Sequence, residues 1–257
     1  MRRIGLTLAA LLSATALAGC GSSSSGGGDD TAGSTQPAST ATAGSFDKVA
    51  AAQQAQGALL TLDDLPSGWT SNPSDASSDD DQEVQGELAD CIGVDASIFA
   101  DDAPDKAKAE SDDFISPNNG ADGEFSEEID VESPDRVASD FEVVNSDKLT
   151  GCLESVFGKF LKEKFAEDPQ TKDAKIGDVT AEREDIPTYG DESVGIEITV
   201  PFTVAGTSAS AVIDMVFVRV GNAVAQLQFN NTFKPFDTQT AASFTSKAAD
   251  KLSQAAS

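Results

Sequence analysis

The strongest constraint on the fold is a change of apolar period near Lys175, after which apolar residues recur at every second position. A period of two is typical of β-strands that bury one face. The alternation is unbroken at Val194, Ile196, Ile198, Val200, Phe202 and Val204. Segment 212–220 is then apolar on both faces, as expected for a central strand covered on both sides. The turn at Gly221-Asn222 leads into 223–229, so we predict a three-strand antiparallel meander.

Further elements place helices beside this meander. The predicted strands are 112–116, 123–131 and 176–186. Pro201 indicates an edge strand or a bulge, because proline cannot donate to a ladder. Ser133 before Pro134 starts a helix, and Asp237 caps another. Since the strands cluster in hairpins, we predict an α+β fold, an antiparallel β-sheet built from hairpins with α-helices packed against it.

Three more helices are expected before the meander. Ser45 would cap a helix that begins at Phe46, with Val49 and Leu60 on its apolar stripe, and a short helix spans 83–91. After Cys152 one continuous apolar face recurs at helical spacing: Leu153, Val156, Phe157, Phe160, Leu161 and Phe165. We interpret this face as core packing, and the alternative is a helix for a membrane surface or a partner.

The N-terminus has the layout of a secretory signal. Arg2 and Arg3 precede an apolar stretch that ends in small residues. Leu17-Ala18-Gly19-Cys20 forms a lipobox, as in bacterial lipoprotein signals, so Cys20 would carry a diacylglycerol. The alternative is an ordinary secretory signal with a chance cysteine. We predict that 1–19 is a lipoprotein signal peptide and that the protein is lipid-anchored in the cell membrane, facing the extracytoplasmic side.

The rest of the chain divides into a tether and one domain. Residues 20–45 combine the lipidated cysteine with a Ser/Thr/Gly-rich segment that lacks large apolar residues. Such a segment cannot offset its ordering entropy, so we expect a disordered linker. Residues 46–257 are expected to form a single α+β extracytoplasmic domain.

Cys91 and Cys152 are the two cysteines that remain once Cys20 is lipidated. Outside the cytoplasmic membrane an even pair is typical of a disulfide. The chain has no histidine to activate a thiol, so catalysis by either cysteine is not expected. We predict one intramolecular disulfide between them.

The net charge of −27 excludes some partners. Acidic residues concentrate between Asp63 and Asp147, where 26 of them accompany only 3 basic residues. Such a field repels phosphate backbones, so no nucleic-acid partner is expected. The acidity is interpreted as a solubilising surface, and the alternative is cation binding or docking to a basic partner.

The usual catalytic motifs are missing. Without histidine a serine triad is impossible, and Gly-x-Ser-x-Gly, a phosphate loop and a dinucleotide fingerprint are absent. Calcium is the only metal with adequate ligands, offered by Asp79-Asp80-Asp81, by Asp101, Asp102 and Asp105, and by Asp112-Asp113. None fits an EF-hand loop, so we predict no metal site, no cofactor and no catalytic residue. The sequon at Asn230-Asn231-Thr232 is interpreted as accidental.

A resemblance to a known group rests on three features. The segment Leu65-Pro66-Ser67-Gly68-Trp69, Cys91 and Cys152 resemble those of actinobacterial cell-envelope lipoproteins. The layout of 46–255 is similar to the extracellular sensor-like domain of PknH-type kinases and to LpqN-type lipoproteins. The PknH-type domain has two disulfides, whereas this chain can form one. The resemblance implies ligand sensing or an accessory role in the envelope rather than catalysis.

We therefore expect a non-catalytic ligand-binding or sensor-like lipoprotein. A pocket is expected between the sheet and its helices, where Trp69, Phe157, Phe160 and Phe217 would line it and take a lipid or glycan. For each aromatic, the competing interpretation is simple core filling. One alternative function is an acidic docking protein for a basic envelope partner, and another is a carboxylate-dependent hydrolase.

Overall fold

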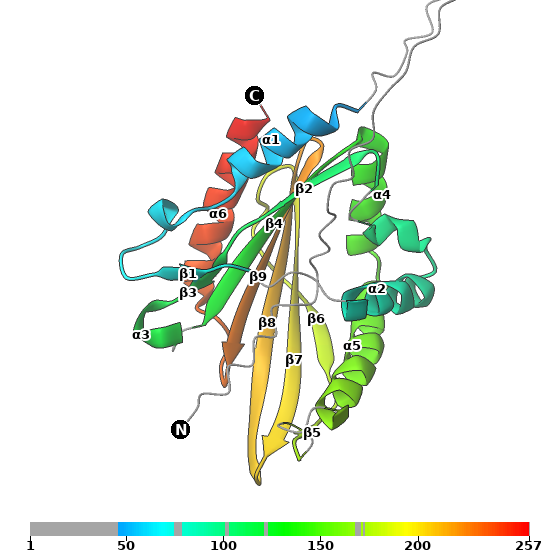
Figure 1. The fold of residues 1–257 in the computed structure, drawn as a ribbon, viewed down its shortest axis with the longest axis vertical. Helices are drawn as coiled ribbons and strands as arrows, with labels where there is room; N and C mark the ends of the chain where they lie inside the picture. Colours follow the sequence, from blue (N-terminus) through cyan, green and yellow to red (C-terminus); the bar gives the residue numbers. More distant parts are fainter. Residues whose placement is uncertain are drawn as a thin grey trace, which may run out of the picture.

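The protein is a sheet between two layers of helices (Figure 1). The computed structural model describes residues 46–74, 79–100, 103–120, 123–167, 171 and 173–256. One face of the sheet is covered by α1 (Lys48–Ala58) and α6 (Thr238–Ala255), and the other by α2 (Asp79–Ile92), α4 (Pro134–Val144) and α5 (Lys148–Glu167). We call these the α1–α6 face and the α2–α5 face. The predicted α+β class is confirmed.

Some predictions concern residues outside the described ranges. These are the signal peptide 1–19, the lipidated Cys20, the linker up to residue 45, and the acidic residues Asp101 and Asp102. Within the described ranges, none of the helices has the length and apolar character needed to cross a membrane. The lipid anchor and the domain boundary at residue 46 stay predictions.

The predicted meander is present. It consists of β7 (Glu192–Val204), β8 (Thr207–Val220) and β9 (Ala223–Thr232), all antiparallel. Ala205 and Gly206 both have positive φ, of 51° and 83°, which suits the tight turn between β7 and β8. The α6 helix that follows is capped as predicted, because the Asp237 side chain accepts a hydrogen bond from the Thr240 N–H.

Strand β8 contributes to both faces of the sheet, as its sequence predicts. Ile213, Met215 and Phe217 belong to the core on the α2–α5 face. Val216 and Val218 belong to the core on the α1–α6 face. The two layers of helices therefore rest on a shared central strand.

The other half of the sheet has four strands where two were predicted. Beyond β9 come β4 (Glu124–Glu132), β3 (Asp113–Ile115) and β1 (Thr70–Asn72), and β2 (Lys106–Glu110) also pairs with β4. The sequence analysis missed β2, because its only apolar residues are Ala107 and Ala109 and its other residues are charged. The short helices are η1 (Leu62–Asp64), η2 (Ala96–Phe99) and α3 (Pro117–Gly120).

The opposite edge of the sheet contains two short strands where one was predicted. They are β5 (Lys175–Ile176) and β6 (Thr180–Glu184), and both pair with β7. Pro201 lies between the two pairings, and its carbonyl accepts a hydrogen bond of 2.7 Å from the Gly177 N–H. The proline therefore marks the break in the edge ladder.

Two helices differ from their predicted limits or faces. Helix α1 begins at Lys48 with Asp47 as its cap, and it buries Ala51, Ala55 and Ala58 while Val49 is 70 % exposed. The predicted apolar stripe of this helix is wrong, because small alanines fit the close approach to the sheet. Helix α5 begins at Lys148, before Cys152 rather than after it, and its apolar face packs in the core as predicted.

Candidate functional site

A cleft lies between the sheet and the helices of the α2–α5 face. It consists of two adjoining cavities of about 140 and 110 Å³. Both cavities are lined by Gln85, Phe99, Val143, Val144, Phe217 and Gln226. Because they share these residues, we treat them as the apolar end and the charged end of one cleft.

The apolar end is formed by alternate side chains of strands β7 and β8, which face the apolar side of helix α5. Ile196 and Ile198 of β7 and Ile213 and Met215 of β8 point to the same face. Helix α5 closes this end from above with Leu149, Leu153 and Phe157, and α2 adds Val84 and Leu88. The lining is almost wholly apolar, apart from Gln85, Gln226 and Gln228.

The charged end begins at the pairing of β2 with β4. Lys106 lies directly opposite Glu132 in the ladder, and its Nζ is 2.6 Å from Asp130 Oδ2 and 3.6 Å from Glu132 Oε1. The Lys106 side chain is only 6 % exposed. Burial alone would lower the pKa of Lys106, but the charges of Asp130, Glu128 and Glu132 raise it above its usual value. Lys106 is therefore charged at any physiological pH.

Arg136 in the first turn of α4 joins this cluster from above. Its guanidinium lies 3.5 Å from Glu132 Oε1, 3.5 Å from Asp140 Oδ2 and 3.6 Å from Asp105 Oδ1. The same guanidinium donates hydrogen bonds to the carbonyls of Ser97 and Ile98. Arg136 thereby ties η2 and α4 to the sheet at the mouth of the cleft.

Glu132 and Asp140 both contribute carboxyl groups to the lining of this end. Burial raises the pKa of Glu132 to about 8, although Lys106 acts in the opposite direction. Burial also raises the pKa of Asp140. No hydrogen-bond donor reaches Glu132 Oε2 or Asp140 Oδ1 within the described residues. Both carboxyl groups therefore favour the protonated form more than an exposed carboxyl group does.

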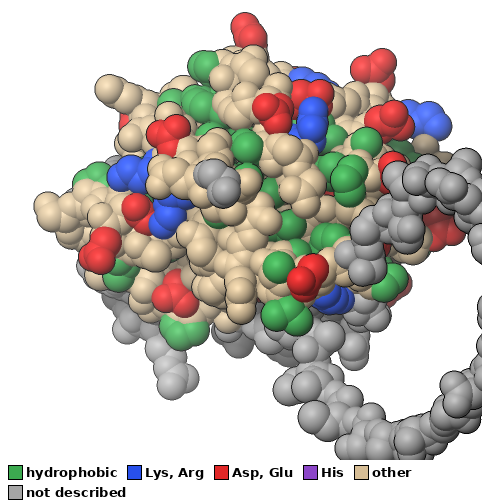
Figure 2. Space-filling model, turned by 90° about the horizontal axis from the view of Figure 1, so that it is seen from above, with side chains coloured by type: hydrophobic (Ala, Val, Ile, Leu, Met, Phe, Trp, Pro, Cys, Tyr) green, Lys and Arg blue, Asp and Glu red, His purple; other side chains and the backbone are tan. Residues whose placement is uncertain are grey.

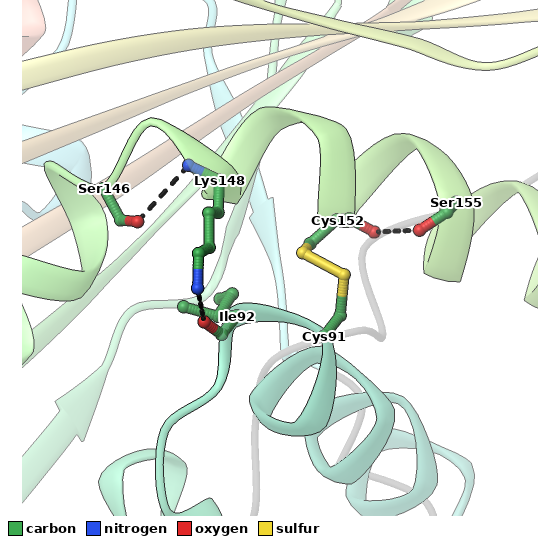
Figure 3. The surroundings of a disulfide bond; sticks show 6 residues. All are labelled: Cys91, Ile92, Ser146, Lys148, Cys152 and Ser155. Atoms are coloured by element: carbon green, nitrogen blue, oxygen red, sulfur yellow. Dashed lines mark hydrogen bonds between the residues drawn. A yellow bond between two sulfur atoms is a disulfide. The ribbon is translucent and has the colours of Figure 1, made fainter.

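The predicted disulfide is present and joins the two helices, α2 and α5, that cover the cleft. Cys91 of α2 and Cys152 of α5 are joined, with their Cα atoms 5.7 Å apart (Figure 3). Beside the bond, Lys148 Nζ donates a 3.0 Å hydrogen bond to the carbonyl of Ile92, the last residue of α2 (Figure 3). A lysine at this position satisfies an otherwise free helix-end carbonyl. One covalent bond and one charged hydrogen bond therefore fix α2 on α5.

The four aromatics predicted to line one pocket lie on different faces. Phe157 and Phe217 line the cleft. Phe160 packs beside the same core without lining either cavity. Trp69 lies on the α1–α6 face, with its ring 5.5 Å from Phe125 and 5.3 Å from Phe244. Placing Trp69 with the others is wrong, because β1 delivers it to the opposite side of the sheet.

The charged end was missed by the sequence analysis, although a signal for it exists. The only three basic residues between Asp63 and Asp147 are Lys106, Lys108 and Arg136. All three form ion pairs at the charged end or beside it. In this strongly acidic segment, the few basic residues therefore indicate the charged end of the cleft better than any run of acidic residues does.

Comparisons with known proteins give structural similarity only. No family model matches the chain, and no curated protein matches it. The extracellular domain of PknH from Mycobacterium tuberculosis is similar over 79 % of this chain and 97 % of that one, with 11 % identity and a TM-score of 0.41. LpqN of Mycobacterium tuberculosis, described as involved in cell envelope biogenesis, is similar over 74 % and 78 %, with 11 % identity and a TM-score of 0.25. The chain is structurally similar to both proteins at low sequence identity.

Proposed function

We propose that this protein is a non-catalytic, membrane-anchored lipoprotein of the cell envelope whose extracytoplasmic domain binds a glycolipid-like molecule in the cleft. The observation that carries the proposal is a single cleft with an apolar end and a charged end. A ligand with an apolar chain and a hydroxyl-rich head would complement both ends.

The apolar end sets the size of the group that enters it. An apolar cavity of about 150 Å³ is large enough for benzene, and this end measures about 140 Å³. Pockets for whole drug-sized ligands are larger, at roughly 300–1,000 Å³. We therefore expect a short segment of an acyl or prenyl chain to be held, with the remainder of the ligand outside.

The charged end sets the chemistry of the head group. Its lining includes the carboxyl groups of Glu128, Asp130, Glu132 and Asp140 against a single lysine, Lys106. Carboxylates accept hydrogen bonds from hydroxyl groups and repel phosphates. This favours a sugar-like head over a phospholipid head.

The location in the envelope has its own support. Disulfides persist in oxidising compartments and are rare in the cytosol, and Cys91 and Cys152 form one here. The predicted lipobox at Cys20 would supply the membrane anchor.

A hydrolase that uses Glu132 and Asp140 is the main catalytic alternative. Glycosidase carboxyl groups are separated by roughly 5–9.5 Å so that the sugar fits between them. Here burial raises the pKa of both carboxyl groups, and Glu132 is only 1 % exposed. Their arrangement therefore favours a structural role.

An acidic docking surface is the second alternative. On the face seen in Figure 2, acidic and basic side chains are interspersed rather than gathered by sign. Capture of a basic envelope protein at low salt that is lost at high salt would favour docking over ligand binding.

The test measures binding of octyl glucoside, below its critical micelle concentration, to the domain. We expect saturable binding by calorimetry, with glucose alone and octyl phosphate binding at least ten-fold more weakly. Val144→Trp should fill the cleft and reduce affinity at least ten-fold, since Val144 lines both cavities. Val49→Trp, at an exposed site on α1, is the matched control and should bind as the parent does.

Native mass spectrometry of the protein from its own host complements this test. A co-purifying glycolipid would support the proposal. Equal binding by both tryptophan variants, or turnover of glycosides that Glu132→Gln abolishes, would contradict it.

A further inference from the structure

Three carboxyl groups from adjacent strands converge on the face of the sheet opposite the cleft. Glu184 of β6, Glu197 of β7 and Asp214 of β8 each place a carboxylate oxygen within 4.8 Å of the other two. Glu197 pairs directly with Asp214 in the ladder, and Glu184 lies opposite Gly195. The convergence therefore follows from the strand register.

The cluster lies on the α1–α6 face of the sheet. Asp214 alternates with Ile213 and Met215, which face the α2–α5 core. Its same-face neighbour along β8, Val216, belongs to the other core. Asp214 is 8 % exposed, Glu197 is half-buried and Glu184 is exposed, so the cluster opens to solvent on the side of β6.

Asp214 is the unusual member of the cluster. Its Oδ1 is buried and has no hydrogen-bond partner in the described part of the chain. The carboxyl group accepts one hydrogen bond, from the Phe236 backbone N–H. Burial, and then the charges of Glu184 and Glu197, raise the pKa of Asp214 to about 7. A buried oxygen without a donor is costly, so it requires a proton or a cation.

Gly195 provides the space for the third carboxylate. A Cβ atom at this position would lie 3.1 Å from Glu184 Cβ and 3.4 Å from Glu184 Oε2. With no side chain at residue 195, Glu184 can lie across β7 toward Glu197 and Asp214. The glycine in the sheet thus allows the exposed Glu184 carboxylate to approach the buried Asp214 carboxylate.

We propose that Glu184, Glu197 and Asp214 bind one calcium ion. The donor set consists of oxygen atoms alone, which hard cations prefer, and it offers no nitrogen or sulfur for zinc. Calcium–oxygen distances of about 2.3–2.6 Å allow ligands on opposite sides of one ion to lie about 5 Å apart. Magnesium usually takes one or two carboxylates and keeps several of its water ligands, so a set of three protein carboxylates favours calcium. The solvent side leaves positions for water ligands.

The ion would fasten the short edge strand β6 to the centre of the sheet. Strand β6 has only five residues and pairs with β7 alone. An ion held by β6, β7 and β8 would add a cross-strand tie that hydrogen bonds do not supply. Three carboxylates and water predict a dissociation constant of about 10⁻⁴–10⁻³ M, as in extracellular calcium modules.

The experiment is a thermal melt of the purified domain after treatment with EDTA and dialysis. We expect 5 mM CaCl₂ to raise Tm by about 2–5 °C over NaCl of equal ionic strength. Calorimetry should show one ion bound per chain. Asp214→Asn should abolish the rise in Tm, and it should stay folded without calcium because it removes a buried charge.

Glu182→Gln is the matched control. Glu182 lies on the same strand two residues away, pairs with Glu197 in the ladder, is exposed and does not belong to the three-carboxylate cluster. It should keep the calcium response if the ion is held by the three carboxylates. A response that MgCl₂ reproduces at equal ionic strength, or one that Glu182→Gln reduces as much as Asp214→Asn, would overturn the proposal. So would a parent protein whose Tm does not change up to 10 mM calcium.

Discussion

The cores on the two faces of the sheet are packed differently. On the α1–α6 face, aromatic rings fill the core, and Phe125 contacts Phe114, Phe229, Phe244 and Trp69 at centroid distances of 4.8–5.5 Å. On the α2–α5 face the core combines aliphatic side chains with Phe141, Phe157 and Phe217, contains the cleft and is closed by a disulfide and buried ion pairs. A face with a cleft leaves part of its core unfilled. Its helices are therefore held by a disulfide and ion pairs, which do not depend on close packing.

The largest expected effect tests the aromatic core. Phe125→Ala should lower the free energy of unfolding by about 3–5 kcal/mol, because it removes a ring that is 1 % exposed and contacts four others. Phe157→Ala, beside the existing cavity, should cost about 1–2 kcal/mol less. Urea denaturation of both variants measures the difference. Equal losses would mean that the α2–α5 face is packed as tightly as the other.

The disulfide provides the second test. Cys91→Ser or Cys152→Ser should lower the free energy of unfolding by about 2–5 kcal/mol without abolishing the fold. The loss should be confined to the α2–α5 face, so hydrogen exchange should rise in α2 and not in α1 or α6. Peptide mapping without reduction checks the bond itself. Free thiols at both positions in protein from the envelope would contradict the claim that a disulfide joins α2 and α5.

The smallest effect concerns Glu127 on the α1–α6 face. Burial raises the pKa of its carboxyl group to about 8, although this group accepts a 2.6 Å hydrogen bond from the Leu60 N–H. Because this pKa is higher in the folded state than in the unfolded one, stability is full below about pH 4.5 and falls as pH rises through 8. Glu132 and Asp214 add to the loss with the same sign.

Glu127→Gln should remove part of this pH dependence. We expect the variant to gain about 2 kcal/mol over the parent at pH 8 and little at pH 5. Urea melts at both pH values measure it. A gain that is equal at the two pH values would show that ionisation of Glu127 does not destabilise the core.

Prediction from the sequence succeeded where the signal is local. The alternation from Val194 to Val204 correctly predicted strand β7, and the apolar face after Cys152 predicted most of helix α5. It failed where pairing partners are distant. The alternation of Lys106 to Glu110 is too polar to indicate a strand by itself, and only β4 makes it one. Asp214 within an otherwise apolar strand was a signal for the carboxylate cluster that the sequence analysis did not use.

By itself, the sequence determined the β-meander, the choice of cysteines for the disulfide and the expectation of a lipid anchor. These depend on period, count and motif, which are properties of neighbouring residues. Only the tertiary structure decided that Trp69 and Phe217 lie on opposite faces, that Lys106 and Arg136 meet at one end of a cleft, and that Glu184 reaches Asp214. Strand register and helix packing bring together residues far apart in the chain, and no local pattern specifies those contacts.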